Sequence, residues 1–381
     1  MHIVIAPNAF KNSLAAGRVA TCIEAGLQQS RLPCTCVCIP VADGGDGTAD
    51  LLIEKFNGLI INGAYTNPLG RKINALFGLI DSGRTAVIEM AAASGLRLLN
   101  KGELNPLRAS SAGTGQMIIS ALDKGAKKII LTLGGSATVD GGCGILHALG
   151  IRFRDASGKE LIPFPGELAQ VTSIDASGLD ARIKNTEIEI WCDVNNNLLG
   201  PSGAAAMFGP QKGASEKDVV ELEYFLNKLN EITIQATGIS VSSIQYGGAA
   251  GGTAAFLHAF LQAKLLNGIS SFLNIVDFEN VLNEADLVIT GEGEIDIQTL
   301  QGKGPFGVAS MAKKKNVPVI ALAGKVPITY YPELSAVFDI LLAINNQPLP
   351  LEEALRLTES NLIRVSREIG NLIFISDPGN I

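Results

Sequence analysis

Long apolar runs are missing from this sequence, because no stretch approaches the ~20 residues that a membrane-spanning helix requires. Residues 1–7 also lack the basic residues and the longer apolar stretch of a signal peptide. We therefore expect no membrane partner and a cytoplasmic location. Charged residues make up only 18% of the chain and hydrophobic residues 47%, which favours folded domains with sizeable cores over a disordered or coiled-coil protein.

Basic residues are in deficit, since 30 Lys and Arg stand against 37 Asp and Glu and the net charge is −7. A general nucleic-acid binder needs a basic surface for its phosphate contacts, so we expect no nucleic-acid partner. A small anionic substrate remains compatible with this charge, because it needs only local positive potential.

Histidine is scarce and the cysteines form no paired motif. His2, His147 and His258 lie far apart in the sequence, which disfavours a His-rich metal centre or a Ser-His-Asp triad. Six cysteines are spread through the chain, unlike a secreted disulfide framework. Three of them alternate within residues 34–38 and would share one face of a strand. We interpret these as small buried apolar residues rather than a metal site, because no histidine lies nearby.

Strand-like and helix-like segments alternate at both ends of the chain. Residues 2–6 and 34–38 have the composition of strands, and between them lies a helical pattern that Ser13 could cap. Further buried strands are expected at residues 287–290, 317–322 and 340–344. This order predicts a parallel sheet covered by helices.

The middle of the chain has a different pattern. Residues 72–80 and 84–90 flank one turn-rich segment, and residues 151–154 and 159–162 flank another, so both predict hairpins and a mixed sheet. Strands are also expected at 128–133 and 187–192. We predict an α/β protein with a parallel, Rossmann- or flavodoxin-like domain (1–70 and 285–381) and an inserted mixed α/β domain (71–284). The active site is expected in the interdomain cleft, beyond the carboxyl ends of strands.

A glycine-rich loop, residues 134–144, follows the strand at 128–133. Glycines let consecutive N–H groups converge on an anion, and Ser136 and Thr138 could donate to phosphate. The alternative is a tight turn with no ligand. Asp140 in this loop and Asp43 share the pattern Asp-Gly-Gly-x-Gly. Either could ligate Mg²⁺ or simply cap a helix or close a turn.

Carboxylates and lysines also follow several predicted strands. Glu292 and Asp296 come after residues 287–290, and Asp193 comes after residues 187–192. Phosphoryl transfer needs a carboxylate to position or deprotonate a hydroxyl, and cations to offset phosphate charge. Lys11 and Lys303 could supply such cations, or could be solvated loop lysines.

Two common nucleotide-binding fingerprints are absent. The sequence has no Walker motif, and residues 291–296 begin like the dinucleotide fingerprint but lack its last glycine. A dehydrogenase is therefore disfavoured.

Taken together, these segments resemble the bacterial glycerate kinase type 1 family over nearly the whole chain. The matching segments are residues 5–7, 10–11, 13–14, 42–48, 89–96, 105–107, 110–111, 113–115, 134–138, 140–142, 193, 198–201, 203–205, 208–214, 250–252, 290–293, 296 and 298–303. So many ordered matches are far more specific than any single loop.

The resemblance implies ATP-dependent phosphorylation of D-glycerate with Mg²⁺. The expected product is 2-phosphoglycerate rather than 3-phosphoglycerate. On this hypothesis Lys11 or Arg71 lies near the glycerate carboxylate, and Asp193 or Asp296 accepts the hydroxyl proton. Asp43, Asp140 or Glu292 would lie near Mg²⁺. The residues expected to hold phosphates are Gly134, Gly135, Ser136, Thr138, Gly291, Gly293 and Lys303.

The sequence departs from the family pattern in two places. Asn8-Ala9 stands where family members usually have Asp-Ser, and Glu294 where they usually have Arg. Either Glu294 faces away from the substrate, or catalysis is impaired, or the substrate differs. The alternatives are a kinase or phosphatase for another small hydroxy acid, and a non-catalytic ligand sensor on the same fold. The sequence does not set the oligomeric state.

Overall fold

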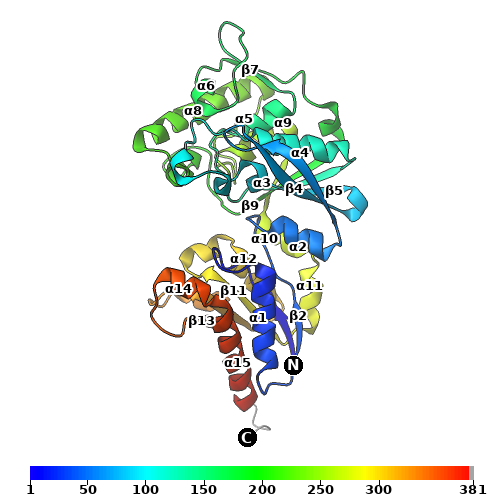
Figure 1. Cartoon of the computed structure of the whole chain (residues 1–381), viewed down its shortest axis with the longest axis vertical. Coiled ribbons are helices and arrows are strands. Elements are labelled where there is room, and N and C mark those ends of the chain that lie inside the picture. Colours follow the sequence, from blue (N-terminus) through cyan, green and yellow to red (C-terminus); the bar gives the residue numbers. More distant parts are fainter. Residues whose placement is uncertain (377–381) are drawn as a thin grey trace. The chain divides into compact units, whose positions relative to one another are not determined.

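The structure, a computed structural model, describes residues 1–376, without the side chains of Gln298 and Gln301. It is an α/β protein that divides into two compact units (Figure 1). Unit 1 comprises Met1–Asp43 and Ile269–Ile381, and unit 2 comprises Gly44–Gly268. Among residues 1–376, no helix combines the length and the apolar character needed to cross a membrane.

Unit 1 contains a five-stranded sheet in the order β13-β12-β11-β1-β2, with every neighbouring pair parallel. Its strands are β1 (His2–Ile5), β2 (Thr35–Cys38), β11 (Leu287–Glu294), β12 (Val319–Lys325) and β13 (Ile340–Ala343). Alternate apolar side chains of β1, β11 and β12 are buried in one core, while Val4, Val288 and Val319 are buried outside it, as expected for strands covered on both faces. The predicted parallel sheet is confirmed, and its order corresponds to the flavodoxin-like 2-1-3-4-5.

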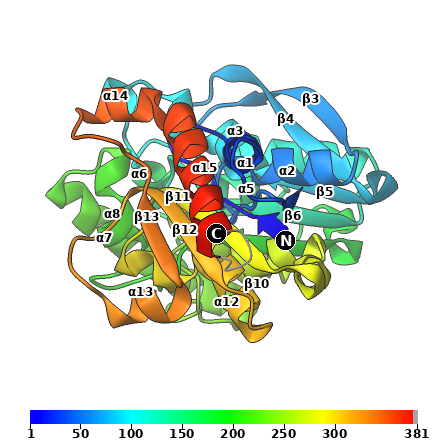
Figure 2. The ribbon, with the colours of Figure 1, turned by 90° about the horizontal axis from the view of Figure 1, so that it is seen from below.

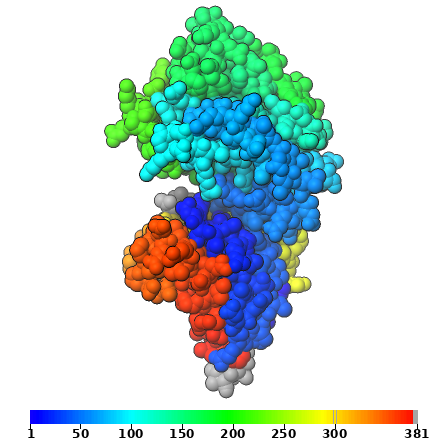
Figure 3. All heavy atoms as spheres, in the orientation of Figure 1, coloured from blue at the N-terminus to red at the C-terminus, as the bar shows by residue number. Residues whose placement is uncertain are grey.

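Helices cover both faces of this sheet, as right-handed crossovers require. They are α1 (Ala16–Gln28), α10 (Gly268–Ile275, which begins at the last residue of unit 2), α11 (Phe278–Val281), α12 (Gly304–Lys314), α13 (Pro332–Val337), α14 (Leu351–Arg356) and α15 (Thr358–Ser376). α1 and α15 lie together on one side of the strands and α12 on the other (Figure 2). The space-filling view shows the orange and red C-terminal segment against the blue N-terminal one (Figure 3).

α1 and α15 pack closely because a glycine removes the side chain between them. A Cβ at Gly26 would overlap the carbonyl oxygen of Ile363. The predicted capping role of Ser13 is wrong. α1 starts after Ala15 without a side-chain cap, and the Ser13 hydroxyl instead donates to Leu355 O at 2.7 Å.

Unit 2 contains a six-stranded mixed sheet in the order β10-β9-β6-β5-β4-β3. Its strands are β3 (Leu59–Thr66), β4 (Lys72–Ile80), β5 (Thr85–Glu89), β6 (Lys128–Thr132), β9 (Glu187–Cys192) and β10 (Lys264–Asn267). β4 is antiparallel to both β3 and β5, which confirms the first predicted hairpin, and the remaining pairs are parallel.

The helices of unit 2 pack against this sheet. They are α2 (Thr48–Lys55), α3 (Met90–Ser94), α4 (Ala112–Asp123), α5 (Cys143–Ala148), α6 (Pro165–Leu168), α7 (Ala204–Phe208), α8 (Glu216–Thr237) and α9 (Thr253–Leu261). Along β6, Ile129 and Leu131 enter the large core of the unit, while Ile130 is buried outside this core, as strand alternation requires.

The second predicted hairpin is wrong, because residues 159–162 do not form the strand that pairs with residues 151–154. β7 (Arg152–Arg154) pairs with β8 (Ser173–Asp175), whereas residues 159–162 form only an isolated bridge between Arg154 and Glu160. The turn itself forms, because Gly158 N donates to Asp155 O at 3.0 Å. Pro163 follows at once and has no N–H with which to extend a ladder.

The unit boundaries also differ from the predicted ones. Residues 44–70 fall in unit 2, because β3 is hydrogen-bonded along its length to β4. Residues 269–284 fall in unit 1, where Ile269 packs against Gly307 of α12. Strand pairing decides these boundaries, and pairing is not visible in a local pattern.

Candidate functional site

The sheet of unit 1 changes winding direction between β1 and β11. In this strand order, the chain leaves β1 and β11 toward opposite faces, and ligands of such folds bind at the carboxyl ends of these two strands. Of the predicted residues, Lys11 follows β1, Glu292 and Lys303 lie at or beyond the end of β11, and Asp43 follows β2, the neighbour of β1. We call this set the switch-point cluster.

Glu292 is the buried centre of the switch-point cluster. Only 7% of it is exposed, and its Oε1 accepts a hydrogen bond from Thr299 Oγ1 at 3.0 Å. Burial raises the pKa of Glu292 to about 7; the nearby charge of Asp43 acts in the same direction, and those of Lys303 and Lys11 oppose it. The structure thus brings Asp43 and the two lysines of unit 1 within electrostatic reach of Glu292.

Asn8 is tied to this cluster through Asp43. Its Nδ2 donates to Asp43 Oδ2 at 3.0 Å, and its Oδ1 accepts from Ala9 N at 2.7 Å. The backbone N–H of Asn8 also donates to Gly291 O at 2.8 Å. An amide at position 8 therefore donates to Asp43, whereas an Asp there would place two carboxylates against each other.

The cluster also includes the start of a helix. Lys303 is the residue before α12, whose first N–H groups and dipole favour an anion. Gly291 and Gly293 leave one face at the end of β11 without side chains, and a Cβ at Gly291 would overlap Leu322 O. Cations, a helix start and bare backbone together suit the binding of phosphate.

Two acidic residues beyond Glu292 have structural partners. Asp296 and Thr299 exchange hydrogen bonds at 3.2 Å, Asp296 N to Thr299 Oγ1 and Thr299 N to Asp296 Oδ1. This exchange starts a 3₁₀ turn, η7 (Ile297–Gln301). Glu294 forms an exposed ion pair with Lys325 of the neighbouring strand at 2.6 Å.

In unit 2, the predicted glycine-rich loop follows β6 directly. Gly135 has a φ of +72°, which favours glycine. Gly134 N donates to Gly44 O at 3.2 Å, and Ala137 N to Ser94 O at 2.8 Å. These two N–H groups are therefore already used inside the protein, so the loop offers fewer backbone donors to an anion than the sequence suggests.

Asp140 ties this loop to the starts of two helices. It is fully buried, and its carboxylate accepts from Ser111 N at 2.8 Å, Ser111 Oγ at 2.7 Å, Gly142 N at 3.0 Å and Gly144 N at 3.2 Å. Burial raises its pKa, while these hydrogen bonds act in the opposite direction. With four protein donors on its carboxylate, Asp140 serves the loop rather than offering a free oxygen pair to a metal.

Lys212 lies beneath the same loop and was missed as a site residue. It is 2% exposed, and its Nζ donates to Ser136 Oγ at 3.0 Å and to Thr138 O at 2.7 Å. Burial lowers its pKa to about 7, while the charges of Asp140 and Asp193 oppose this shift. Asp193, at the end of β9, is thereby placed near the loop. The only sequence signal was the Gly-Pro-Gln-Lys-Gly segment within the resemblance.

Glu89 was also missed. It ends β5, and its Oε1 accepts from Ala49 N at 2.8 Å in the first turn of α2. Burial raises its pKa to about 7, and the charges of Asp50 and Asp46 add to this shift. Glu89, the loop after β6 and Asp193 follow adjacent parallel strands, so they share one edge of the sheet.

Comparison with known proteins decides the family. The model of the glycerate kinase family matches residues 3–374. A glycerate kinase from Bacillus subtilis (strain 168) is 45% identical over 369 residues, which cover 97% of each chain. A glycerate 2-kinase from Escherichia coli (strain K12) is 44% identical over 379 residues, 98% of each chain.

The chain belongs to the glycerate kinase family. It is therefore an enzyme of the kinase class. A crystal structure assigned as glycerate kinase 2 from Salmonella typhimurium LT2 superposes with a TM-score of 0.85 at 41% identity and covers 99% of both chains. The α/β architecture described above is thus that of a solved member of the family.

In this member of the glycerate kinase family, the predicted site residue Arg71 is already engaged by other residues of the protein. It follows the turn between β3 and β4, where its N–H donates to Asn67 Oδ1 at 3.0 Å. Its guanidinium pairs with Glu103 at 2.8 Å, and its side chain is 52% exposed. A substrate carboxylate at Arg71 would have to compete with Glu103.

No group of three or more His, Cys, Asp or Glu side chains is preassembled for a metal within residues 1–376. Mg²⁺ in kinases is commonly held by one or two carboxylates together with substrate phosphates. Asp43 and Glu292 provide two such carboxylates in unit 1, close enough for the charge of Asp43 to act on Glu292. Their hard oxygen donors fit Mg²⁺, which the kinase class implies.

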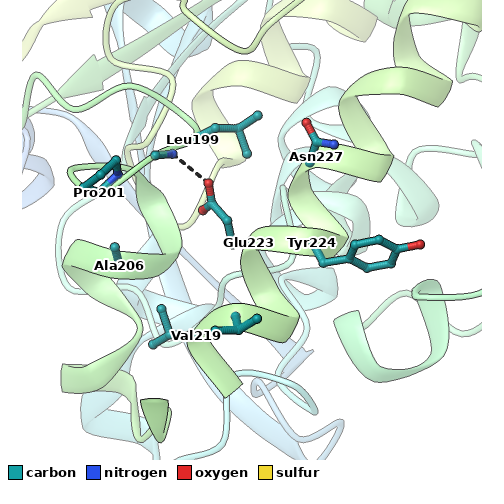
Figure 4. A pocket seen from close by; sticks show the side chains of 9 residues that line it. Leu199, Pro201, Ala206, Val219, Glu223, Tyr224 and Asn227 are labelled. Atoms are coloured by element: carbon teal, nitrogen blue, oxygen red, sulfur yellow. Dashed lines mark hydrogen bonds between the residues drawn. The ribbon is translucent and has the colours of Figure 1, made fainter. Parts of the chain in front are cut away.

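Unit 2 also contains a pocket of about 680 Å³ between α7 and α8 (Figure 4). Glu223 accepts a hydrogen bond there from Gly200 N at 2.7 Å. The walls of the pocket are mainly apolar and are formed by Leu199, Pro201, Ala206, Val219 and Val220. None of the predicted site residues lines this pocket, although Leu199–Pro201 belongs to a segment of the family pattern.

Proposed function

We propose that this enzyme transfers the terminal phosphoryl group of ATP, in the presence of Mg²⁺, to the 2-hydroxyl of D-glycerate, in the cytoplasm. The observation that carries the proposal is the switch-point cluster, in which Lys11, Lys303 and Asp43 lie within electrostatic reach of the buried Glu292, beyond the carboxyl ends of parallel strands. Phosphoryl transfer depends mainly on positioning and on charge neutralisation, and this set supplies both. The relative named glycerate 2-kinase supports the 2-hydroxyl.

On this proposal, unit 1 binds the phosphates of the nucleotide. Lys303 and the start of α12 would neutralise phosphate charge, and Gly291 and Gly293 would let the phosphates approach the backbone. Asp43 and Glu292 would hold Mg²⁺, which offsets charge on the transferred group. Lys11 remains the candidate for the glycerate carboxylate, because Arg71 is engaged by Glu103.

The proton of the acceptor hydroxyl would be taken by Asp193 or Asp296. Asp296 already starts the η7 turn through Thr299, whereas Asp193 follows β9 within electrostatic reach of the buried Lys212. We therefore favour Asp193.

A coupled assay with ATP, Mg²⁺ and D-glycerate tests this function directly. We expect ADP release that requires both D-glycerate and Mg²⁺ and stops with a chelator, and NMR of the product should identify 2-phosphoglycerate. A panel of other small hydroxy acids separates the alternatives. ADP release with another acid but not with D-glycerate would reassign the substrate, and tight glycerate binding without ADP release would indicate a sensor.

A further inference from the structure

The loop after β6 carries no cation of its own. Residues 129–151 contain neither lysine nor arginine, whereas a Walker-type phosphate loop has a lysine beside its hydroxyl residue. In the structure, the ammonium group of Lys212 lies at this loop, 3.0 Å from Ser136 Oγ. The two residues are 76 positions apart in the sequence.

The local backbone holds Lys212 in its buried position. The short 3₁₀ turn η5 (Pro210–Lys212) begins with a proline and ends at Gly213, whose φ is +96°. A Cβ at Gly213 would overlap the carbonyl oxygen of Leu104. Only glycine adopts this conformation in this space without strain, so the turn constrains the backbone on either side of Lys212.

The surroundings of Lys212 lack a hydrogen-bonded counter-ion. Within the described part of the chain, its Nζ donates to a hydroxyl and a backbone carbonyl but to no carboxylate. The nearby Asp140 carboxylate already accepts four hydrogen bonds. The buried hydroxyl of Thr138 has no partner among the described residues. Burying an ammonium group without a paired anion is energetically costly. The Lys212 ammonium and the Thr138 hydroxyl are therefore available to interact with a bound anion.

We propose that Lys212 is the cation of the Gly134–Thr138 loop, a positioning residue that orients Ser136 and supplies positive charge to a phosphoryl group bound on the loop. The inference rests on the proposed kinase function and deepens it. Gly135 is exposed and Ser136 is 5% exposed, so a ligand reaches the loop from the side of these residues. An anion there would favour the charged form of Lys212, opposing the effect of burial.

A lysine titration on the wild-type protein tests the proposal without any folding risk. The Lys212 signal of lysine-labelled protein is assigned by its loss in Lys212→Met or Lys212→Arg, and is followed by NMR against pH. We expect inorganic phosphate or Mg²⁺-ADP to raise its midpoint by about one pH unit or more, which corresponds to ~10-fold stronger protonation. A shift with D-glycerate alone would instead assign the loop to the substrate carboxylate, and no shift with any of the three would overturn the proposal.

Variants provide the second arm. Lys212→Met should lower kcat/KM by ~10²–10³-fold, and Lys212→Arg, which keeps the positive charge, should retain part of the activity. Lys228→Met is the matched control, because Lys228 Nζ also donates to a backbone carbonyl, Ala169 O at 2.9 Å. We expect its turnover to be unchanged. Equal losses in both variants would indicate a purely structural role.

The two proposals fail in distinguishable ways. If the wild-type enzyme is active but phosphate does not shift the pH-titration midpoint of Lys212, only the proposed role of Lys212 is contradicted. A midpoint that responds to phosphate in a protein that does not phosphorylate glycerate contradicts the proposed function and leaves the anion site standing.

Discussion

Thr299 Oγ1 donates a hydrogen bond to Glu292 Oε1 at 3.0 Å, and this contact orients a buried carboxylate that lies near two lysines and Asp43. The pair joins β11 to the η7 turn that follows it. It keeps one oxygen of Glu292 occupied by a protein donor and fixes the direction of the other.

Mg²⁺ binding should weaken as pH falls through the pKa of Glu292, which burial raises to about 7. Protonation below this pH gives a neutral acid that is a poor Mg²⁺ ligand, so apparent Mg²⁺ affinity should drop between pH 8 and pH 6. Glu292→Gln keeps an acceptor for Thr299 but should bind Mg²⁺ ~10-fold more weakly at pH 8, with a flatter pH dependence. Mg²⁺ titrations of the initial rate check this, and parallel pH profiles for the two enzymes would contradict it.

Asn8→Asp should make the cluster more dependent on Mg²⁺. The new carboxylate would face Asp43 where Asn8 Nδ2 now donates at 3.0 Å, and like charges at this distance repel. We expect lower thermal stability without Mg²⁺ and a larger gain in melting temperature on adding Mg²⁺ than in the wild type. Asn8→Ala is the control, since it removes the hydrogen bond without adding charge. An equal Mg²⁺ response in both variants would count against a cation between positions 8 and 43.

Replacing the two candidate bases separately should identify the one that accepts the proton. Asp193→Asn is expected to lower kcat by ~10²–10⁴, the usual contribution of such a group. Asp296→Asn should mainly perturb the η7 turn, because Asp296 Oδ1 accepts from Thr299 N. Steady-state kinetics and circular dichroism separate these effects. If neither variant loses more than ~10-fold in turnover, the base lies elsewhere.

Asp140→Asn should destabilise the protein irrespective of Mg²⁺. An amide retains one acceptor oxygen and turns an NH₂ group toward N–H and O–H donors, which leaves buried groups unsatisfied at a cost of ~1–3 kcal/mol. Urea unfolding measures this loss. Asp175→Asn is the control, because Asp175 is a partly exposed residue at the end of β8 that accepts from Ser177 N at 3.0 Å. A loss seen only with Mg²⁺ present would restore Asp140 as a metal ligand.

The sequence by itself determined the local elements. Continuous apolar runs predicted β1, β11 and β12, because strands buried on both faces leave this simple pattern. A similar run predicted β13, which is an edge strand without a fully buried residue. The sequence also located the loops beyond strands β1, β2, β6 and β11, since their glycines and charged residues stand at the ends of those runs. Lys11, Asp43, Glu292 and Lys303 could therefore be named before any fold was known.

Only the tertiary structure decided which of these residues meet and what they do there. The pairing of β3 with β4 moved a domain boundary, and β8 replaced residues 159–162 beside β7. Asp140 was singled out for a metal, yet donors from residues 111, 142 and 144 occupy its carboxylate. Lys212 lies in a segment without periodicity, and its partner Ser136 is 76 residues away. Burial, charge and hydrogen bonding are set by such distant contacts, and no local pattern in the chain encodes them.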